Sequence, residues 1–317
     1  MPARLLTSTL IISGLLSCGL AVNFRKILPV DGTEELLQLD GDRLEFFRST
    51  TGIDDIEELK KHIVAVQREA YEARPYPCIV GFIFTQLRLS RLGTIYDRLL
   101  GLGKSRQHPI LLDVGCCLGT DLRKLIADGY PRDSVIATDV VPEFWDLGHK
   151  LFKTSAETFP VRFLPGDIFD PAFLEPTPPT YNRPPTVAPL PSSVRTLTDL
   201  RGHVSAITIC AVFHIFETEE TQLRLARALA SLLSPEPGSM IVGLHTGLRE
   251  KGWWRGQTFH MFCHSPESWA EMWDGDVFEK GSVRVDAWLV ERERRSMQDG
   301  VARVTPTSIL EWSVTRV

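Results

Sequence analysis

The stretch Ile110-Leu111-Leu112-Asp113-Val114-Gly115-Cys116-Cys117-Leu118-Gly119-Thr120-Asp121-Leu122-Arg123-Lys124 decides the fold. An apolar run typical of a buried strand ends at Asp113, two glycines follow four positions apart, and an amphipathic helical pattern begins directly after them. Glycine permits a tight turn and a close approach of the backbone to a ligand. The N–H groups at the start of the helix favour a carboxylate or a phosphate. The pattern therefore predicts a nucleotide-type binding turn.

The residues of this turn discriminate between nucleotide ligands. A dinucleotide fingerprint of the form G-x-G-x-x-G needs glycine where this chain has Cys117. A P-loop would close on Gly-Lys-Ser/Thr, which does not follow here. The acid at the strand end, Asp113, suits a ligand with a cationic amine, which pyrophosphate cofactors lack.

Two more strand-like runs end in acids, residues 135–139 at Asp139 and residues 161–167 at Asp167. Three strand-end acids at this pacing fit S-adenosylmethionine, with Asp113 facing its amine, Asp139 the ribose hydroxyls and Asp167 the adenine amino group. The alternative is a doubly wound domain whose turn acids only cap helices. The predicted cofactor site comprises Asp113, Gly115, Cys116, Gly119, Asp139, Val140, Asp167 and Ile168.

The chain resembles class I (Rossmann-like) S-adenosylmethionine-dependent methyltransferases, and more narrowly the fungal branch that tailors secondary metabolites such as meroterpenoids. The resemblance runs from about residue 45 to the C-terminus, with a departure at residues 207–211, where a His and a small residue are expected. Its motifs are the turn at 113–124, Tyr76-Pro77-Cys78-Ile79, Asp128-Gly129-Tyr130-Pro131, Phe213-His214-Ile215-Phe216, Leu233-Ser234-Pro235-Glu236-Pro237-Gly238-Ser239 and His264-Ser265-Pro266-Glu267-Ser268-Trp269.

The resemblance implies an α/β fold: a mostly parallel Rossmann-like sheet with helices on both faces and an antiparallel C-terminal strand pair. Alternating residues place that pair at 283–290 and 308–317. We expect an apolar segment at 1–22, a helical N-terminal cap at 23–107 and the methyltransferase domain at 108–317. The proline-dense segment 171–200 reads as a long surface loop. The implied reaction is O-methylation of a carboxylate or hydroxyl on a small, largely apolar metabolite.

Charge and cysteine content bear on partners and compartment. The net charge of −5 argues against a nucleic-acid partner. The six cysteines show no C-x-x-C pair, and the adjacent thiols at 116 and 117 suggest a reducing, cytoplasmic setting. The apolar run at residues 5–22 resembles a signal-peptide core or a weak membrane anchor, so secretion or membrane contact is the alternative.

Candidate acceptor-site residues follow strands four and five, expected at 204–210 and 239–244. His214 is the preferred general base, and the alternative is a structural histidine under aromatic rings. His245 is expected just past strand five, facing the acceptor. Trp253 and Trp254, on an expected loop, form either an aromatic lid or a packing anchor. Tyr76, within its motif, is also assigned to the acceptor.

Other readings are weaker. His260, Cys263 and His264 lack a fourth ligand with recognisable spacing, so we expect no metal site. Arg123 and Lys124 are expected on the solvated side of the first helix. A regulatory protein that keeps the cofactor site without turnover, or a protein methyltransferase, is the alternative function; a solvent-exposed patch in place of an acceptor pocket would favour the regulatory reading.

Overall fold

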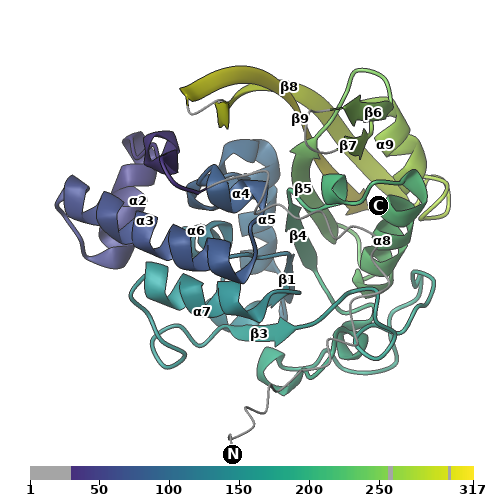
Figure 1. Ribbon diagram of the computed structural model, residues 1–317. Helices are drawn as coiled ribbons and strands as arrows, with labels where there is room; N and C mark the ends of the chain where they lie inside the picture. The colour runs from purple at the N-terminus through teal and green to yellow at the C-terminus, as the bar shows by residue number, and fades with distance from the viewer. Residues whose placement is uncertain (1–29, 256–259, 299–300) are drawn as a thin grey trace, which may run out of the picture.

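The computed structural model describes residues 30–255, 260–298 and 301–317, and the predictions for residues 1–22 lie outside this part of the chain. Its main sheet has seven strands in the order β3-β2-β1-β4-β5-β9-β8 (Figure 1). The strands are β1 (Leu111–Val114), β2 (Val135–Asp139), β3 (Arg162–Pro165), β4 (Ala206–Cys210), β5 (Met240–Thr246), β8 (Val283–Gln298) and β9 (Val301–Arg316).

The first five strands run parallel, and β9 is antiparallel to both β5 and β8. The central strands β1, β2, β4 and β5 are buried throughout, which explains their continuous apolar sequences. The predicted Rossmann-like sheet with an antiparallel C-terminal pair is confirmed.

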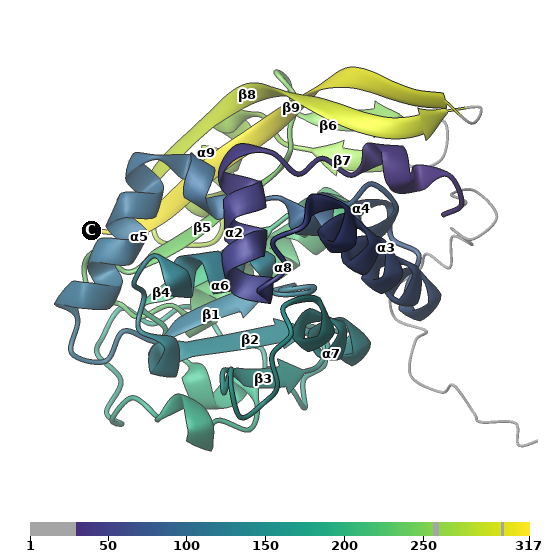
Figure 2. The same cartoon turned by 90° about the vertical axis from the view of Figure 1, so that its left-hand side faces the viewer.

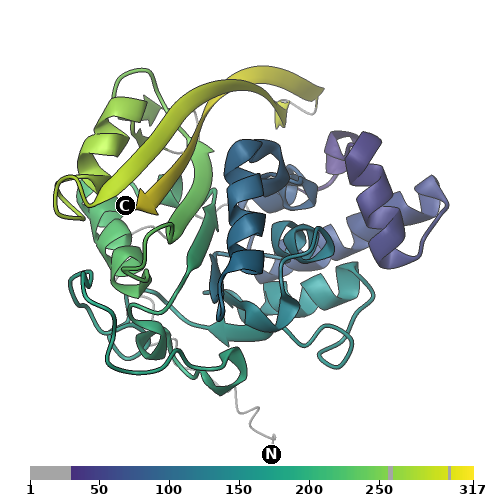
Figure 3. The same ribbon diagram turned by 180° about the vertical axis from the view of Figure 1, so that it is seen from behind.

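Helices cover both faces of the sheet, as predicted (Figures 1 and 3). Helices α8 (Glu219–Leu232) and α9 (Pro266–Trp273) pack on one face, together with buried residues of β4, β5 and β9. Helices α5 (Thr94–Ser105) and α6 (Thr120–Ala127), with Trp145 of α7 (Pro142–Leu151), pack on the other. Helix α5 falls within the range assigned to the cap, yet it packs on the sheet.

The N-terminal cap lies beside the start of α6 and against α7. Helix α3 (Ile56–Ala73) begins after Asp55, because the Asp55 side chain accepts the N–H of Glu58 at 2.8 Å and caps the first turn. The cap's apolar core includes Leu118 of the binding turn and Phe144 of α7. Its elements are η1 (Thr33–Leu36), α2 (Gly41–Thr51), α3 (Ile56–Ala73), α4 (Pro77–Val80), η2 (Ile83–Thr85) and η3 (Leu89–Leu92).

The proline-rich segment 171–200 is better anchored than a surface loop. It has two short 3₁₀ turns, η5 (Pro191–Ser193) and η6 (Leu197–Leu200). Prolines prevent a longer helix or a ladder strand here, but they leave isolated apolar side chains able to point inward. Five of these enter the core around α8: Phe173, Leu174, Val194, Leu197 and Leu200.

Two β-hairpins extend beyond the expected strands. Strands β6 (Gly252–Arg255) and β7 (His260–Cys263) form a separate antiparallel sheet, so the expected loop at Trp253 and Trp254 is wrong. The β8–β9 hairpin is far longer than 283–290 and 308–317, because its outer half is charged and carries little apolar alternation. It passes over the cap (Figure 2), where Met297 and Ala302 pack against the cap core. In the described residues, no helix is both long and apolar enough to cross a membrane.

Candidate cofactor and acceptor site

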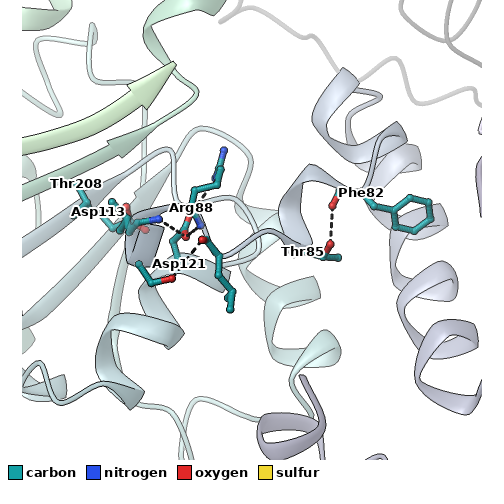
Figure 4. Close-up of polar contacts among 9 residues, drawn as sticks. Phe82, Thr85, Arg88, Asp113, Asp121 and Thr208 are labelled. Carbon is teal, nitrogen blue, oxygen red and sulfur yellow. Dashed lines mark hydrogen bonds and ion pairs between the residues drawn. The ribbon is translucent and has the colours of Figure 1, made fainter. Parts of the chain in front are cut away.

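The carboxyl ends of β1, β2 and β3 lie side by side, which brings the predicted strand-end acids to one edge of the sheet. Asp113 is buried near the end of β1 and accepts a hydrogen bond from the Thr208 hydroxyl of β4 at 2.7 Å (Figure 4). Thr208 stands within the segment where the sequence departs from the family pattern, and its role was not predicted.

Burial dominates the electrostatics of Asp113. Loss of water raises the pKa of its carboxyl to about 7, against the opposing effect of the hydrogen bond from Thr208, and the nearby Asp121 carboxylate raises it further. Because burial disfavours the charged form of this carboxyl, a cation that binds next to it stabilises the carboxylate. Asp113 is therefore suited to a ligand's ammonium group.

The glycines of the turn are required by space as well as by conformation. Gly115 has φ +67°, and a Cβ there would lie 2.5 Å from Cγ2 of Val212. Gly119 has φ +73°, and a Cβ there would lie 3.2 Å from the Trp145 ring. Cys117 also adopts a positive φ, 52°, so this turn reaches the left-handed region without a third glycine. Cys116 is buried, and burial raises the pKa of its thiol.

Asp139 and Asp167 also hold the backbone of turns, although neither is the N-cap of a helix. Asp139 accepts the N–H of Cys117 at 2.8 Å and that of Val141 at 3.0 Å, while burial raises the pKa of its carboxyl. Asp167 accepts the N–H of Phe169 at 2.9 Å. A carboxylate has about four acceptor positions, so each acid retains capacity for a ligand. Val140 is half exposed beside Asp139.

An ion pair that the sequence analysis missed lies over the turn. Asp121, the second residue of α6, accepts the backbone N–H groups of Arg88 and Leu89 at 2.6 and 3.0 Å, and Nε of Arg88 at 3.1 Å (Figure 4). Asp121 thereby fixes the segment before η3 against the helix that follows the turn. Asp121 stands inside the quoted motif, but nothing in its spacing points to a partner 33 residues earlier.

Tyr76 lies on the cofactor side of the site. It precedes α4, its ring contacts Phe144 with centroids 6.1 Å apart, and burial and the nearby Asp139 carboxylate both raise the pKa of its phenol. The structure therefore places Tyr76 with the predicted ribose-binding acid rather than with the residues after β4.

His214 lies in η7 (Phe213–Ile215), directly after β4, and is half-buried. Its Nδ1 accepts the backbone N–H of Thr246 at 3.1 Å. Burial lowers the pKa of the imidazole to about 4, and the positive charges of Arg294 and Arg88 lower it further. The side chain is therefore neutral at neutral pH, with Nδ1 engaged by the end of β5.

His245 does not lie past strand five. It is inside β5, 2 % exposed, and its Nδ1 accepts the indole N–H of Trp312 at 3.1 Å. Its ring is enclosed by Phe213 and Trp269, with centroids 5.5 and 4.7 Å away. Strand five continues two residues beyond its expected end because β9 pairs along its whole length. His245 belongs to this aromatic packing and does not face an open acceptor space.

The two adjacent tryptophans cannot form one lid. On strand β6 successive side chains point to opposite faces. Trp253 is 47 % exposed and meets Phe262 of β7 edge to face, while the neighbouring Trp254 pairs with Met261, which is buried. At most one of these rings can face an acceptor.

Arg123 corrects another expectation. It is 5 % exposed, and its guanidinium lies 3.9 Å from the ring centre of Phe159, whereas the neighbouring Lys124 pairs with Asp128 on the outer side of α6. Burial lowers the pKa of Arg123 to about 9. Within the described ranges, no three His, Cys, Asp or Glu side chains are arranged to hold a metal ion; Cys263 and His264 are buried, and His264 bonds Ser268.

Comparisons with known proteins bear on the class of protein to which this chain is similar. Residues 33–85 match the family described as the meroterpenoid methyltransferase N-terminal domain. The O-methyltransferase atr3 of Stereocaulon alpinum is 30% identical over 60% of this chain and 48% of its own length, so the match spans about half of that relative. The O-methyltransferase phiE of a fungal species is 28% identical over 81% of this chain and 79% of its own, and nvfJ of Aspergillus novofumigatus is 27% identical over 73% and 75%.

The strand order and the acid-bearing glycine turn define the Rossmann-like fold of the class I methyltransferases. Within that class, the matched N-terminal family and the named relatives make the chain similar to fungal methyltransferases of secondary metabolism, meroterpenoid methyltransferases among them.

Proposed function

We propose that this protein transfers the methyl group of S-adenosylmethionine to a carboxylate oxygen of a small, largely apolar metabolite and forms a methyl ester. The observation that carries this choice of acceptor is the hydrogen bond from the Thr246 N–H to Nδ1 of His214. A backbone N–H can only donate, so Nδ1 must accept, and the neutral imidazole then carries its proton on Nε2.

A protonated Nε2 donates a hydrogen bond and cannot remove a proton. His214 therefore acts as a donor to the acceptor oxygen, not as the predicted general base. A hydroxyl acceptor usually needs such a base, whereas a carboxylate is already anionic at neutral pH. The charges of Arg294 and Arg88, felt at His214, also favour an anion in this part of the site.

The cofactor supplies the electrophilic methyl group when bound. The buried Asp113 fits its ammonium, Asp139 its ribose hydroxyls and Asp167 its adenine amino group, while Gly115 lets the backbone approach it. Ile215, half exposed next to His214, offers an apolar contact to the metabolite. The names of two relatives, atr3 and phiE, specify O-methylation.

The test is to incubate the full chain with methyl-labelled S-adenosylmethionine and matched apolar carboxylic acids and alcohols. We expect label in an alkali-labile methyl ester from an acid and none from the corresponding alcohol. Label in an alkali-stable methyl ether contradicts the carboxylate assignment. Label confined to protein supports the protein methyltransferase alternative, and cofactor binding without turnover supports the regulatory one.

We also propose a cytoplasmic location and a small molecule, not a nucleic acid, as the partner, with membrane contact through residues 5–22 as the alternative. The cofactor is used inside cells, and within the described residues five cysteines are free thiols, two of them in the turn. Expression with a C-terminal tag, cell fractionation and sequencing of the mature N-terminus test this. Recovery of the protein from the medium, or with membranes, contradicts it.

A further inference from the structure

The space above the binding turn contains a cation that the assignments to Asp113, Asp139 and Asp167 leave unused. Arg88 comes from the segment before η3 and lies between Asp121 and the end of β1 (Figure 4). Its side chain is 17% exposed. The Asp121 carboxylate fixes Arg88 by accepting hydrogen bonds from the backbone N–H of Arg88 and from its Nε.

The guanidinium faces the groups that surround the turn. Burial raises the pKa of Asp113 in β1 and of Cys210 at the end of β4, and the charge of Arg88 opposes that rise. The pKa of Cys78 in α4 is lowered by a hydrogen bond with Cys117 and also by Arg88. Burial lowers the pKa of His214, and the charge of Arg88 lowers it further. These residues belong to four different elements, so the charge acts on groups around the carboxyl ends of β1 and β4.

The chemistry of the ligand requires two charges of opposite sign at this place. The amino-acid end of S-adenosylmethionine carries an ammonium and a carboxylate on one carbon atom. A carboxylate brought beside the buried Asp113 without a cation would meet another negative charge and lose its hydration. Because the Nε proton of Arg88 goes to Asp121, its terminal N–H groups provide the fork that a carboxylate prefers.

We infer that Arg88, held in place by Asp121, binds the carboxylate of the cofactor's amino-acid end while Asp113 binds its ammonium. Arg88 is then a cofactor-binding residue supplied by the N-terminal part of the chain, and Asp121 is its positioning residue. This inference rests on the proposed use of S-adenosylmethionine.

The experiment compares two ligands on the purified full chain by calorimetry. S-adenosylhomocysteine has the amino-acid end, and 5′-methylthioadenosine keeps the nucleoside and thioether without it. In Arg88→Gln we expect roughly 10- to 100-fold weaker binding of S-adenosylhomocysteine, because a charged hydrogen-bonded pair is lost. For 5′-methylthioadenosine, which lacks the amino-acid end, we expect no more than about a twofold change. Arg88→Lys keeps the charge without the fork and should lie between the two.

The variant should remain folded, because Asp121 still accepts the backbone N–H groups at positions 88 and 89. Binding of 5′-methylthioadenosine checks this in the same sample. Arg91→Gln is the matched control, since it removes an exposed arginine from the short helix η3 that follows Arg88, and it should leave both affinities unchanged.

Equal weakening of both ligands in Arg88→Gln, or of neither, overturns the inference and leaves Arg88 as a link between α6 and the preceding segment. A wild-type protein that binds neither ligand overturns the cofactor assignment itself. The two failures are therefore distinguishable.

Discussion

The two halves of the sheet edge differ in how their sites are built. On the cofactor side, the acids lie at or just after the carboxyl ends of their own strands, and the turn between β1 and α6 is a single local motif. On the acceptor side, His214 is held by Thr246, 32 residues away, and His245 by Trp312, 67 residues away. A site made by backbone geometry is visible in the sequence, whereas a site made by distant side chains acquires its chemistry only in the fold.

The largest effect is expected from a substitution of Trp312, which tests whether the aromatic cluster on the acceptor side stabilises the fold. Trp312 is fully buried, and its ring centre lies 4.8 Å from that of Trp269. Trp312→Ala should lower the free energy of unfolding by about 3–5 kcal/mol, through the cavity and the lost partner of His245. Urea denaturation measures this. The matched Trp253→Ala removes a half-exposed ring and should cost under about 1 kcal/mol; equal losses would contradict the distinction.

On the cofactor side, Asp113→Asn should separate binding from stability. Loss of the charged contact should weaken S-adenosylhomocysteine binding by about 1.5–3 kcal/mol. At pH 8, ligand-free Asp113→Asn should be more stable than the ligand-free wild type. The native pKa of Asp113, about 7, lies above the ordinary 3.8, so ionisation of this carboxyl opposes folding of the wild type increasingly as the pH rises between these values. Calorimetry and thermal unfolding at pH 5 and pH 8 measure both.

The pH dependence of the same affinity provides the control. In the wild type, binding should strengthen as the pH rises through about 7 and the Asp113 carboxylate forms. In Asp113→Asn this dependence should vanish. A wild-type affinity that does not change from pH 6 to pH 8 would contradict the pairing of Asp113 with the ligand's ammonium.

A smaller effect distinguishes a hydrogen-bond donor from a base at His214. Glutamine can accept the Thr246 N–H and donate from its amide, so His214→Gln should keep kcat within a few-fold, while His214→Leu should lose about 1–1.5 kcal/mol of transition-state stabilisation. Because the pKa of His214 is about 4, the wild-type kcat, measured at saturating cofactor, should be flat from pH 6 to pH 8. A loss of about 10²–10⁴-fold in kcat in both variants would support the alternative that His214 is a general base.

The smallest effect concerns the outer side of α6. Lys124 and Asp128 form an i,i+4 ion pair, and Lys124→Ala should lower the free energy of unfolding by only about 0.3–0.5 kcal/mol. The adjacent Arg123→Ala should cost more, since Arg123 is buried against Phe159. Equal losses in the free energy of unfolding for the two variants, measured by urea denaturation, would show that Arg123 is solvated, as the sequence pattern predicted.

The sequence predicted the sheet, its antiparallel C-terminal pair and the glycine turn, because each depends on apolar runs or on backbone conformation. It did not predict Thr208 or Arg88, whose partners Asp113 and Asp121 are 95 and 33 residues away. It misplaced His245 because the end of β5 depends on pairing with β9. It read Arg123 as solvated because helical periodicity shows which side of α6 a residue is on, but not that Phe159 comes from beyond α7 to cover it.

The order of strands also has a consequence for synthesis of the protein. Strand β9 is made after β8 but inserts between β8 and β5, pairing Met240 with Thr315. Until residues near 315 leave the ribosome, the apolar strand β5 has an unpaired edge, which is a template for aggregation. Strand β5 is complete at Thr246, so its edge stays unpaired for some 69 residues of translation, from Thr246 to Thr315, and chaperones would be needed most in that interval.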